Sequence, residues 1–320
     1  MVFAHSIEQI REAQQFLGAH LPRTQLIAAA GVSRGNAGAY LKLETELPTG
    51  SFKPRGALYA LSRNLQRRRI GEVTASSTGN HGAAVAWAAK TLGIPATIFL
   101  PAHPNPVKRK NIADLGARIV EAGGTDLTTA LLEAKAYSAR PDVYFLNDAT
   151  DPDLLAGPAV IGLEILGQLP DVAALYVPMG DTALIRGVAT CVKQVKPDTR
   201  VIGVQAERAP SYYLSWKAGR PVPTETCDTC ADGLATRTPE AENVTAIRQL
   251  VDDVVLVSEN EMLGAIRLLY ERETVLAEPA GAAATAAFLR HPAPAGSAVL
   301  LVTGANISSE VRTQAGIPPV

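Results

Sequence analysis

The chain has 320 residues, of which 47% are hydrophobic and 19% are charged. This composition excludes a disordered chain, and the length accommodates about two domains of roughly 150 residues each. The 30 lysine and arginine residues are balanced by 31 aspartate and glutamate residues, which argues against a nucleic-acid-binding protein, because binding to a phosphate backbone depends on clustered positive charge.

The cysteine count and the first residues predict a cytoplasmic protein. Three cysteines are too few, and odd in number, for a disulfide framework. Glu8, Arg11 and Glu12 interrupt the apolar core that a signal peptide needs. The segment instead predicts a surface helix, because Ser6 and Gln9 have capping-box spacing. Apolar stretches elsewhere end well before the roughly 20 residues of a membrane span, so we expect no membrane segment.

Beyond this helix, short apolar runs alternate with helical patterns. The runs typical of buried strands are residues 39–44, 72–76, 96–100, 117–121, 143–146, 175–178, 201–204, 254–257 and 298–303. The helical patterns are residues 54–67, 80–92, 107–115, 127–139, 184–194 and 259–272. Continuous apolar strands that alternate with helices are typical of parallel sheets covered on both faces. We therefore expect an α/β fold that binds its ligand beyond the carboxyl ends of the strands.

The segment 211–243 has weak periodicity and many turn-forming residues. It predicts a long surface loop, and loops of that length are usually functional or mobile. Cys227 and Cys230 in this segment form a C-x-x-C pair. A zinc site needs two further ligands, and no partner with suitable spacing follows. We expect free thiols.

A lysine stands between a predicted strand and a predicted helix, in the segment 49–57 (TGSFKPRGA). Desolvation in an apolar turn lowers the pKa of a lysine and favours the neutral amine, so Lys53 could form a Schiff base with a carbonyl. The alternative is a capping turn with Ser51 as N-cap, Pro54 in the first helical turn and Lys53 in solvent. The local residues alone favour this second interpretation.

A second polar turn, residues 76–82 (SSTGNHG), again follows a predicted strand and precedes a helix. Backbone amides at the start of a helix form an anion site suited to a carboxylate or a phosphate. The glycines do not follow the G-x-G-x-x-G dinucleotide pattern. An ordinary turn capped by Asn80 explains the segment equally well, so the local sequence leaves both interpretations open.

Together, the two segments resemble those of the fold-type II pyridoxal-phosphate enzymes, and most closely the threonine dehydratase and serine racemase branch. The resemblance continues through residues 21–24 (LPRT), 231–235 (ADGLA), 278–282 (EPAGA) and 303–306 (TGAN). It implies a tryptophan synthase β-like fold of two open, mostly parallel sheets covered by helices. It also implies a large cofactor-binding domain from residues 1–70 and 147–320, a small mobile domain from residues 71–146 inserted in it, and a homodimer.

The same resemblance assigns roles to individual residues. Lys53 would hold pyridoxal 5'-phosphate as a Schiff base and, once the substrate amine frees it, remove the Cα proton. Phe52 would pack against the cofactor ring, Asn80 would hydrogen-bond its phenolic oxygen, and Thr303 would lie beside its pyridine nitrogen. The loop that would bind the substrate carboxylate consists of Ser77, Thr78, Gly79, Asn80 and His81.

The phosphate-binding segment departs from the family pattern. The branch usually has four consecutive glycines followed by leucine, whereas residues 179–184 read MGDTAL. The resemblance places the phosphate at Gly180, Asp181, Thr182, Ala183 and Leu184, whose backbone amides can still surround an anion. A carboxylate repels a phosphate dianion. We therefore expect the Asp181 side chain to turn away and cap the backbone, or cofactor affinity to be reduced.

Two further departures favour elimination over racemisation. A serine of serine racemase that reprotonates the face opposite the lysine is replaced here by Thr78. Its additional methyl group stiffens χ1 and crowds the site, although Thr78 stays a catalytic candidate. The acidic ligands of the racemase cation site are matched by Gln205 and Ser211, which lack the charged oxygens that hard cations prefer. We therefore predict no metal there.

The resemblance thus predicts a pyridoxal-phosphate-dependent dehydratase, or ammonia-lyase, that converts a 3-hydroxy amino acid to a 2-oxo acid and ammonia. Threonine and serine are the expected substrates, and substrates with a bulkier or acidic β-substituent, such as phenylserine, hydroxyaspartate or a hydroxyectoine breakdown product, stay open. One alternative is an amino-acid racemase or a β-replacement synthase of the same fold. Another is a non-catalytic amino-acid-binding or regulatory protein, which Asp181 favours and the intact Lys53, Asn80 and Thr303 oppose.

Overall fold

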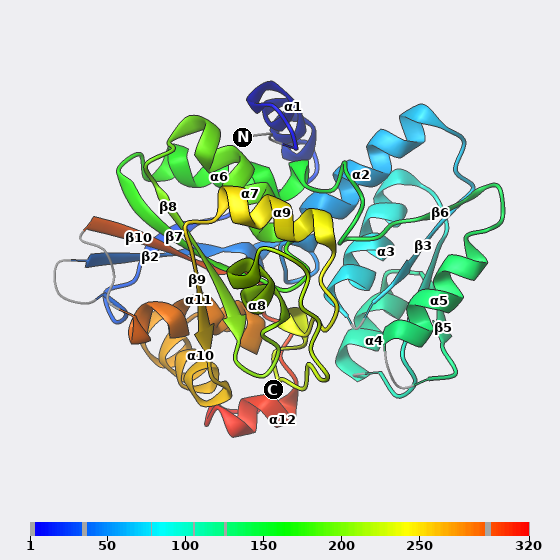
Figure 1. Cartoon of the computed structure of the whole chain (residues 1–320). Coiled ribbons are helices and arrows are strands. Elements are labelled where there is room, and N and C mark those ends of the chain that lie inside the picture. The colour runs from blue at the N-terminus through cyan, green and yellow to red at the C-terminus, as the bar shows by residue number, and fades with distance from the viewer. Residues whose placement is uncertain are drawn as a thin grey trace.

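Two open sheets form the framework of the computed structural model, which describes residues 4–33, 37–77, 79–104, 106–124, 127–291 and 296–319. The larger sheet has the strand order β1-β2-β10-β7-β8-β9, and the smaller sheet has the order β5-β4-β3-β6. Every described strand pair is parallel except β1 with β2. The expected fold class, two mostly parallel sheets covered by helices, is confirmed (Figure 1).

The larger sheet draws its strands from both ends of the chain, and the smaller sheet from the middle. The strands of the larger sheet are β1 (Leu26–Ala28), β2 (Ala37–Leu43), β7 (Val172–Pro178), β8 (Arg200–Ala206), β9 (Asp253–Val257) and β10 (Gly296–Val302). Those of the smaller sheet are β3 (Glu72–Ser76), β4 (Ala96–Leu100), β5 (Arg118–Glu121) and β6 (Val143–Phe145).

The helices follow most strands in turn. They are α1 (Ile7–Gly18), α2 (Lys53–Arg67), α3 (Asn80–Leu92), α4 (Pro106–Asp114), α5 (Leu127–Tyr137), α6 (Ala156–Gln168), α7 (Ala183–Val195), α8 (Ser211–Ala218), α9 (Ala241–Leu250), α10 (Glu259–Glu273), α11 (Pro279–Arg290) and α12 (Ser309–Gln314). The short 3-10 helices among the described residues are η1 (Glu44–Glu46) and η2 (Asp232–Leu234). No helix among the described residues is both long and apolar enough to cross a bilayer.

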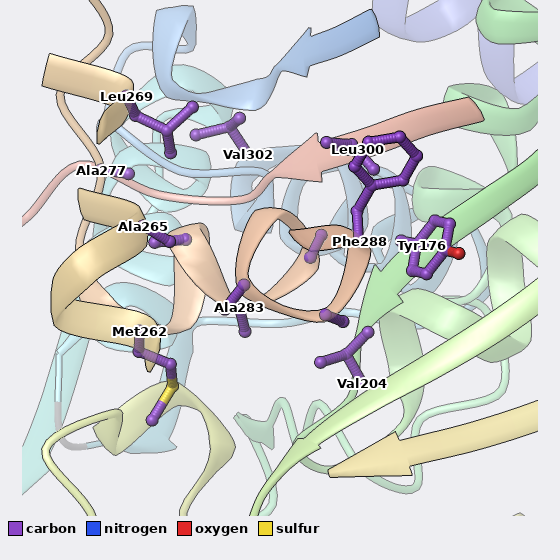
Figure 2. Close-up of a cluster of buried hydrophobic side chains, with 14 of the residues drawn as sticks. Tyr176, Val204, Met262, Ala265, Leu269, Ala277, Ala283, Phe288, Leu300 and Val302 are labelled. Atoms are coloured by element: carbon purple, nitrogen blue, oxygen red, sulfur yellow. The ribbon is translucent and has the colours of Figure 1, made fainter. Parts of the chain in front are cut away.

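Alternate residues of the central strand β10 enter two different cores, because successive side chains of a strand point to opposite faces. Ala298, Leu300 and Val302 pack with α10 and α11, whereas Val299 and Leu301 pack with α6, α7 and α9. Figure 1 shows these two helical layers below and above the larger sheet. In the first core, Phe288 of α11 meets Tyr176 of β7 edge to face, with ring centroids 5.6 Å apart (Figure 2).

The smaller sheet is covered on both faces in the same way. Ile98 and Leu100 of β4 belong to the core shared with α2 and α3, while Phe99 between them packs against α5. Covering helices on both faces leave the ends of the parallel strands as the accessible edge of each sheet, where ligands bind in such folds.

The prediction of a long surface loop at residues 211–243 is only partly correct. It contains α8, η2 and the start of α9, and the Tyr212 side chain is buried.

Cys227 and Cys230 are half-buried free thiols. Gln205 accepts a hydrogen bond from the Tyr213 amide, and Ser211 donates one to a backbone carbonyl. Among the described residues, no group of three His, Cys, Asp or Glu side chains could hold a metal ion.

Candidate active site

Lys53 is the first residue of α2, and the segment before it is fixed by the loop after β10. The Phe52 amide donates to the Thr303 carbonyl at 3.0 Å, and Ser51 forms an isolated β-bridge with Gly304. Ser51 is therefore not the N-cap, a position that Phe52 occupies. The lysine side chain is only 16% exposed, so the interpretation that placed Lys53 in solvent is wrong.

The Lys53 ammonium group contacts two carboxylates. Its Nζ lies 2.6 Å from Asp148 Oδ2 and 3.1 Å from Asp181 Oδ2. Burial opposes the positive charge, but the two carboxylates outweigh it and raise the pKa of Lys53. The expectation of a lowered pKa is therefore wrong for the protein without cofactor. Asp148 was missed by the sequence analysis, although it stands just beyond the carboxyl end of β6, where such folds place ligand-binding residues.

Asp181 both caps a helix and contacts the lysine. Its Oδ1 accepts a hydrogen bond at 2.9 Å from the amide of Ala183, the first residue of α7, while Oδ2 faces Lys53. Burial and the neighbouring charge of Asp148 raise the pKa of Asp181. Asn243 of α9 joins this loop to the loop after β6, since its amide donates to the carbonyls of both Asp181 and Ala149. The start of α7 thus binds an anionic oxygen already.

Thr182 has a backbone conformation that β-branched residues rarely adopt, with φ of +75°. Arg186, one turn further along α7, donates from Nε to Thr182 Oγ1 at 3.0 Å and from Nη2 to the Ala149 carbonyl at 2.8 Å. Arg186 is buried, and no carboxylate among the described residues lies within 4.0 Å of its guanidinium. Burial lowers the pKa of Arg186. This arginine, which the sequence analysis also missed, adds positive charge beside the segment 180–184.

The loop after β3 lies against the loop after β6, which carries Asp148. Ser77 Oγ accepts a hydrogen bond from the Gly79 amide at 2.9 Å. The His81 ring lies 3.0 Å from the Leu146 carbonyl through Nε2, and because a carbonyl only accepts, Nε2 carries the proton. Its Nδ1 is then a buried atom without a hydrogen-bond partner, 3.7 Å from Asp148 Oδ2. Thr78 lies outside the described residues, so its role stays a prediction.

Asn80, the first residue of α3, joins the loops of the two sheets. Its Nδ2 donates to Glu278 Oε1 at 2.6 Å, and its Oδ1 accepts from Asn306 at 2.8 Å. Burial raises the pKa of Glu278 to about 7, although the nearby Lys108 opposes this shift. Lys108 of α4 also forms an ion pair with Asp232 in η2. Segments far apart in the sequence therefore converge on one polar site, where the carboxyl ends of strands from both sheets meet.

Comparison with known proteins agrees with this arrangement. The sequence profile of the family described as "Pyridoxal-phosphate dependent enzyme" matches residues 18–304. The L-threonine ammonia-lyase of Thermotoga maritima is 37% identical over 304 residues, which cover 94% of this chain and 76% of that protein. The chain belongs to the pyridoxal-phosphate dependent enzyme family. The matched range includes residues 278–282, quoted above for the resemblance, and it ends within the other quoted segment, residues 303–306.

Solved structures of this family share the fold. The crystal structure of a threonine deaminase from T.th. superposes with a TM-score of 0.87 at 32% identity, covering 95% of this chain and 99% of that chain. Maize serine racemase superposes with a TM-score of 0.89 at 28% identity, covering 98% of this chain and 97% of that chain. The fold-type II resemblance is therefore confirmed.

The described residues fit the cofactor of this family. Pyridoxal 5'-phosphate carries an aldehyde and a phosphate, and the site offers a half-buried amine at Lys53 close to helix-start amides that bind an anionic oxygen. A Cβ atom on Gly180 would lie only 2.2 Å from the Gly233 carbonyl oxygen, so this segment packs tightly against the 231–235 loop. Asp181 opposes the fit, because its carboxylate takes one of the amides that a phosphate would use.

Gly180→Ala is expected to weaken cofactor binding at least about 10-fold and to destabilise the protein by about 1–3 kcal/mol, because the Gly233 backbone must move. Titration of cofactor-free protein by fluorescence and chemical denaturation measure the two effects. Gly264→Ala in α10 is the matched control: its new Cβ meets no atom within 4 Å, so it should stabilise the protein by about 0.5–1 kcal/mol. Equal cofactor affinity in both variants would contradict the placement of the phosphate.

Proposed function

We propose that the protein is a pyridoxal-phosphate-dependent ammonia-lyase that converts a 3-hydroxy amino acid, such as threonine or serine, to a 2-oxo acid and ammonia. The observation that carries the proposal is the half-buried Lys53 amine beside the anion-binding start of α7. The relatives named threonine ammonia-lyase and threonine deaminase, at 37% and 32% identity, support this reaction.

In the proposed site, Lys53 would hold the cofactor, and the amides of residues 180–184 would hold its phosphate. Phe52 would pack against the ring, Asn80 would donate to its phenolic oxygen, and Thr303 would lie beside its pyridine nitrogen. The hydrogen bond from the Phe52 amide to the Thr303 carbonyl supports the placements of these two residues, since it brings both to the start of α2. When bound, the cofactor withdraws electrons from the substrate Cα and so acidifies its proton.

The remaining chemistry falls to residues of this chain. Once the substrate amine has displaced it from the cofactor, Lys53 would act as the general base that removes the Cα proton, which requires the neutral form of its amine. The substrate carboxylate is held by residues 77–81, with Thr78 among them; the amides at the start of α3 support this role. Loss of the 3-hydroxyl as water and uptake of one water then give the 2-oxo acid and ammonia.

Asp181→Asn is expected to tighten binding of pyridoxal 5'-phosphate by about 10-fold. Asparagine keeps the oxygen that accepts the Ala183 amide but removes a negative charge close to the phosphate. A 10-fold change in affinity corresponds to the loss of about 1.4 kcal/mol of repulsion. Equilibrium titration of cofactor-free protein measures the change. A weaker-binding variant would show that Asp181 assists the cofactor and would overturn this explanation.

We further propose a cytoplasmic homodimer in which residues 71–146 form a small mobile domain and residues 1–70 and 147–320 form the large one. All strands of the smaller sheet fall between residues 72 and 145, which supports this division. The contact of Lys108 with Asp232 and Glu278 links the two parts.

Product analysis tests the function. Purified holoenzyme should release 2-oxobutanoate and ammonia in equal amounts from threonine, with no accumulation of the other enantiomer. The likeness to maize serine racemase makes racemisation the second candidate. Scrambling of a single serine enantiomer without release of oxo acid would overturn the lyase and support the racemase.

A further inference from the structure

Asp148 is a partly exposed carboxylate beside the reacting amine, and it follows β6 on the loop to α6. Its Oδ2 lies 2.6 Å from Lys53 Nζ, and its side chain is 21% exposed. A general base works at about 3 Å from the atom that carries the proton, so the substrate Cα would lie within about 6 Å of this carboxylate oxygen. An ammonium group on C4 of the substrate, three bonds from Cα, would then be within reach of a charge-assisted hydrogen bond to Asp148.

Asp148 is paired with a cation in this structure. Burial opposes ionisation, but His81 and the Lys53 ammonium outweigh it and lower the pKa of Asp148. The buried His81 Nδ1, which has no hydrogen-bond partner, faces the carboxylate at 3.7 Å. In this structure, the Lys53 ammonium group is therefore the cation that contacts the Asp148 carboxylate.

The cation that pairs with Asp148 is lost when the enzyme is loaded. Lys53 ceases to be a free ammonium group once it holds the cofactor. Arg186 donates to Thr182 and to the Ala149 carbonyl, and not to either carboxylate. In the described part of the site, a cationic substrate group would restore the ion pair that Lys53 forms here.

We propose that Asp148 binds an ammonium group on the substrate side chain, so that the enzyme prefers 3-hydroxy-2-amino acids that carry an amino group on C4. This inference rests on the proposed function and names its substrate class. The simplest member is 2,4-diamino-3-hydroxybutanoate, which is threonine with an amino group on its methyl carbon.

The reaction balances without a further reactant. Lys53 takes the Cα proton, the C3–O bond breaks, and the hydroxyl leaves with a proton as water. Hydrolysis of the resulting enamine consumes one water and releases ammonia from Cα. The products are 4-amino-2-oxobutanoate and one ammonia, and the C4 ammonium group is retained.

Two substrates of equal size isolate the effect of charge. In 2-amino-3-hydroxypentanoate a methyl group replaces the C4 ammonium group of 2,4-diamino-3-hydroxybutanoate. The wild-type holoenzyme should favour the cationic substrate by about 10- to 100-fold in kcat/KM, as expected for a hydrogen bond to a charged group, and Asp148→Asn should bring this ratio close to 1. The control Asp151→Asn lies on the same loop but contacts Tyr144 instead of Lys53, and should keep the wild-type ratio.

Binding of unreactive analogues gives a readout independent of turnover. The analogues 2,4-diaminobutanoate and 2-aminopentanoate lack the 3-hydroxyl and cannot lose water. Their dissociation constants, measured from the cofactor absorbance, should differ by a similar factor in the wild type and become equal in Asp148→Asn.

The possible results distinguish the role of Asp148 from the proposed lyase function. Release of oxo acid from threonine and from the neutral substrate, with no preference for the cationic compounds in either assay, would overturn the role of Asp148 and leave the lyase standing. Failure of every 3-hydroxy amino acid to yield oxo acid would overturn the proposed function, while the binding assay would still decide whether Asp148 selects a cation.

Discussion

Lys53→Ala should lower the rate of oxo-acid release by about 1,000-fold or more, because one side chain serves as cofactor anchor and as general base. The variant should also fail to bind the cofactor covalently, so that the absorbance band of the linked cofactor is absent. A coupled oxo-acid assay and an absorbance spectrum measure the two effects.

The fold should survive this substitution. Lys53 is the first residue of α2, and its ion pairs involve half-buried carboxylates that are accessible to water. The matched control is Lys90→Ala on α3, whose side chain is exposed; it should leave both the rate and the spectrum unchanged. Substantial oxo-acid release by Lys53→Ala, with a native circular dichroism spectrum, would show that another residue performs the proton transfer.

Arg55→Met is expected to destabilise the protein by about 3–5 kcal/mol, the largest stability effect that we predict for a single side chain. The Arg55 guanidinium is 1% exposed and donates to Glu44 at 2.7 Å and to Glu164 at 2.8 Å. Lys42 also pairs with Glu164, at 2.6 Å. Removal of the arginine leaves buried carboxylates without their main cation. Chemical denaturation of the cofactor-free protein measures the loss.

An exposed arginine provides the comparison. Arg267 pairs with Glu271 one turn away on α10, and both side chains are about half exposed. Because such surface pairs contribute little, Arg267→Met should change the free energy of unfolding by no more than about 0.5 kcal/mol. Equal losses of unfolding free energy in the two variants would show that the buried ion pairs of Arg55 stabilise the protein no more than an exposed ion pair does.

The sequence predicted those elements whose pattern is set by local chemistry. β3, β4 and α3 match the expected bounds, because each is an apolar run or helix that ends at a turn former. Helices α6 and α11 were missed, since nearly all their residues are small or apolar and buried. A helix enclosed on all sides lacks the polar face on which a periodicity argument depends. Figure 2 shows Ala283 and Phe288 of α11 within the cluster of buried side chains.

The site could be predicted only in part, for a different reason. The turns at Lys53 and Asn80 stand out because they lie between a strand and a helix, and the family resemblance then gave them roles. The partners of these residues come from remote segments: Asp148 and Asp181 are 95 and 128 residues from Lys53. Nothing in the local pattern of either aspartate indicates such a contact, since only the pairing of strands brings the loops together.

Lys53 is the residue that we propose to carry the cofactor. Reduction of the holoenzyme with borohydride, followed by digestion and mass spectrometry, tests this claim most directly. We predict one reduced pyridoxyl phosphate per chain, on the peptide that contains Lys53. Modification of a different lysine, or a reduced protein without any pyridoxyl group after incubation with excess cofactor, would contradict the account.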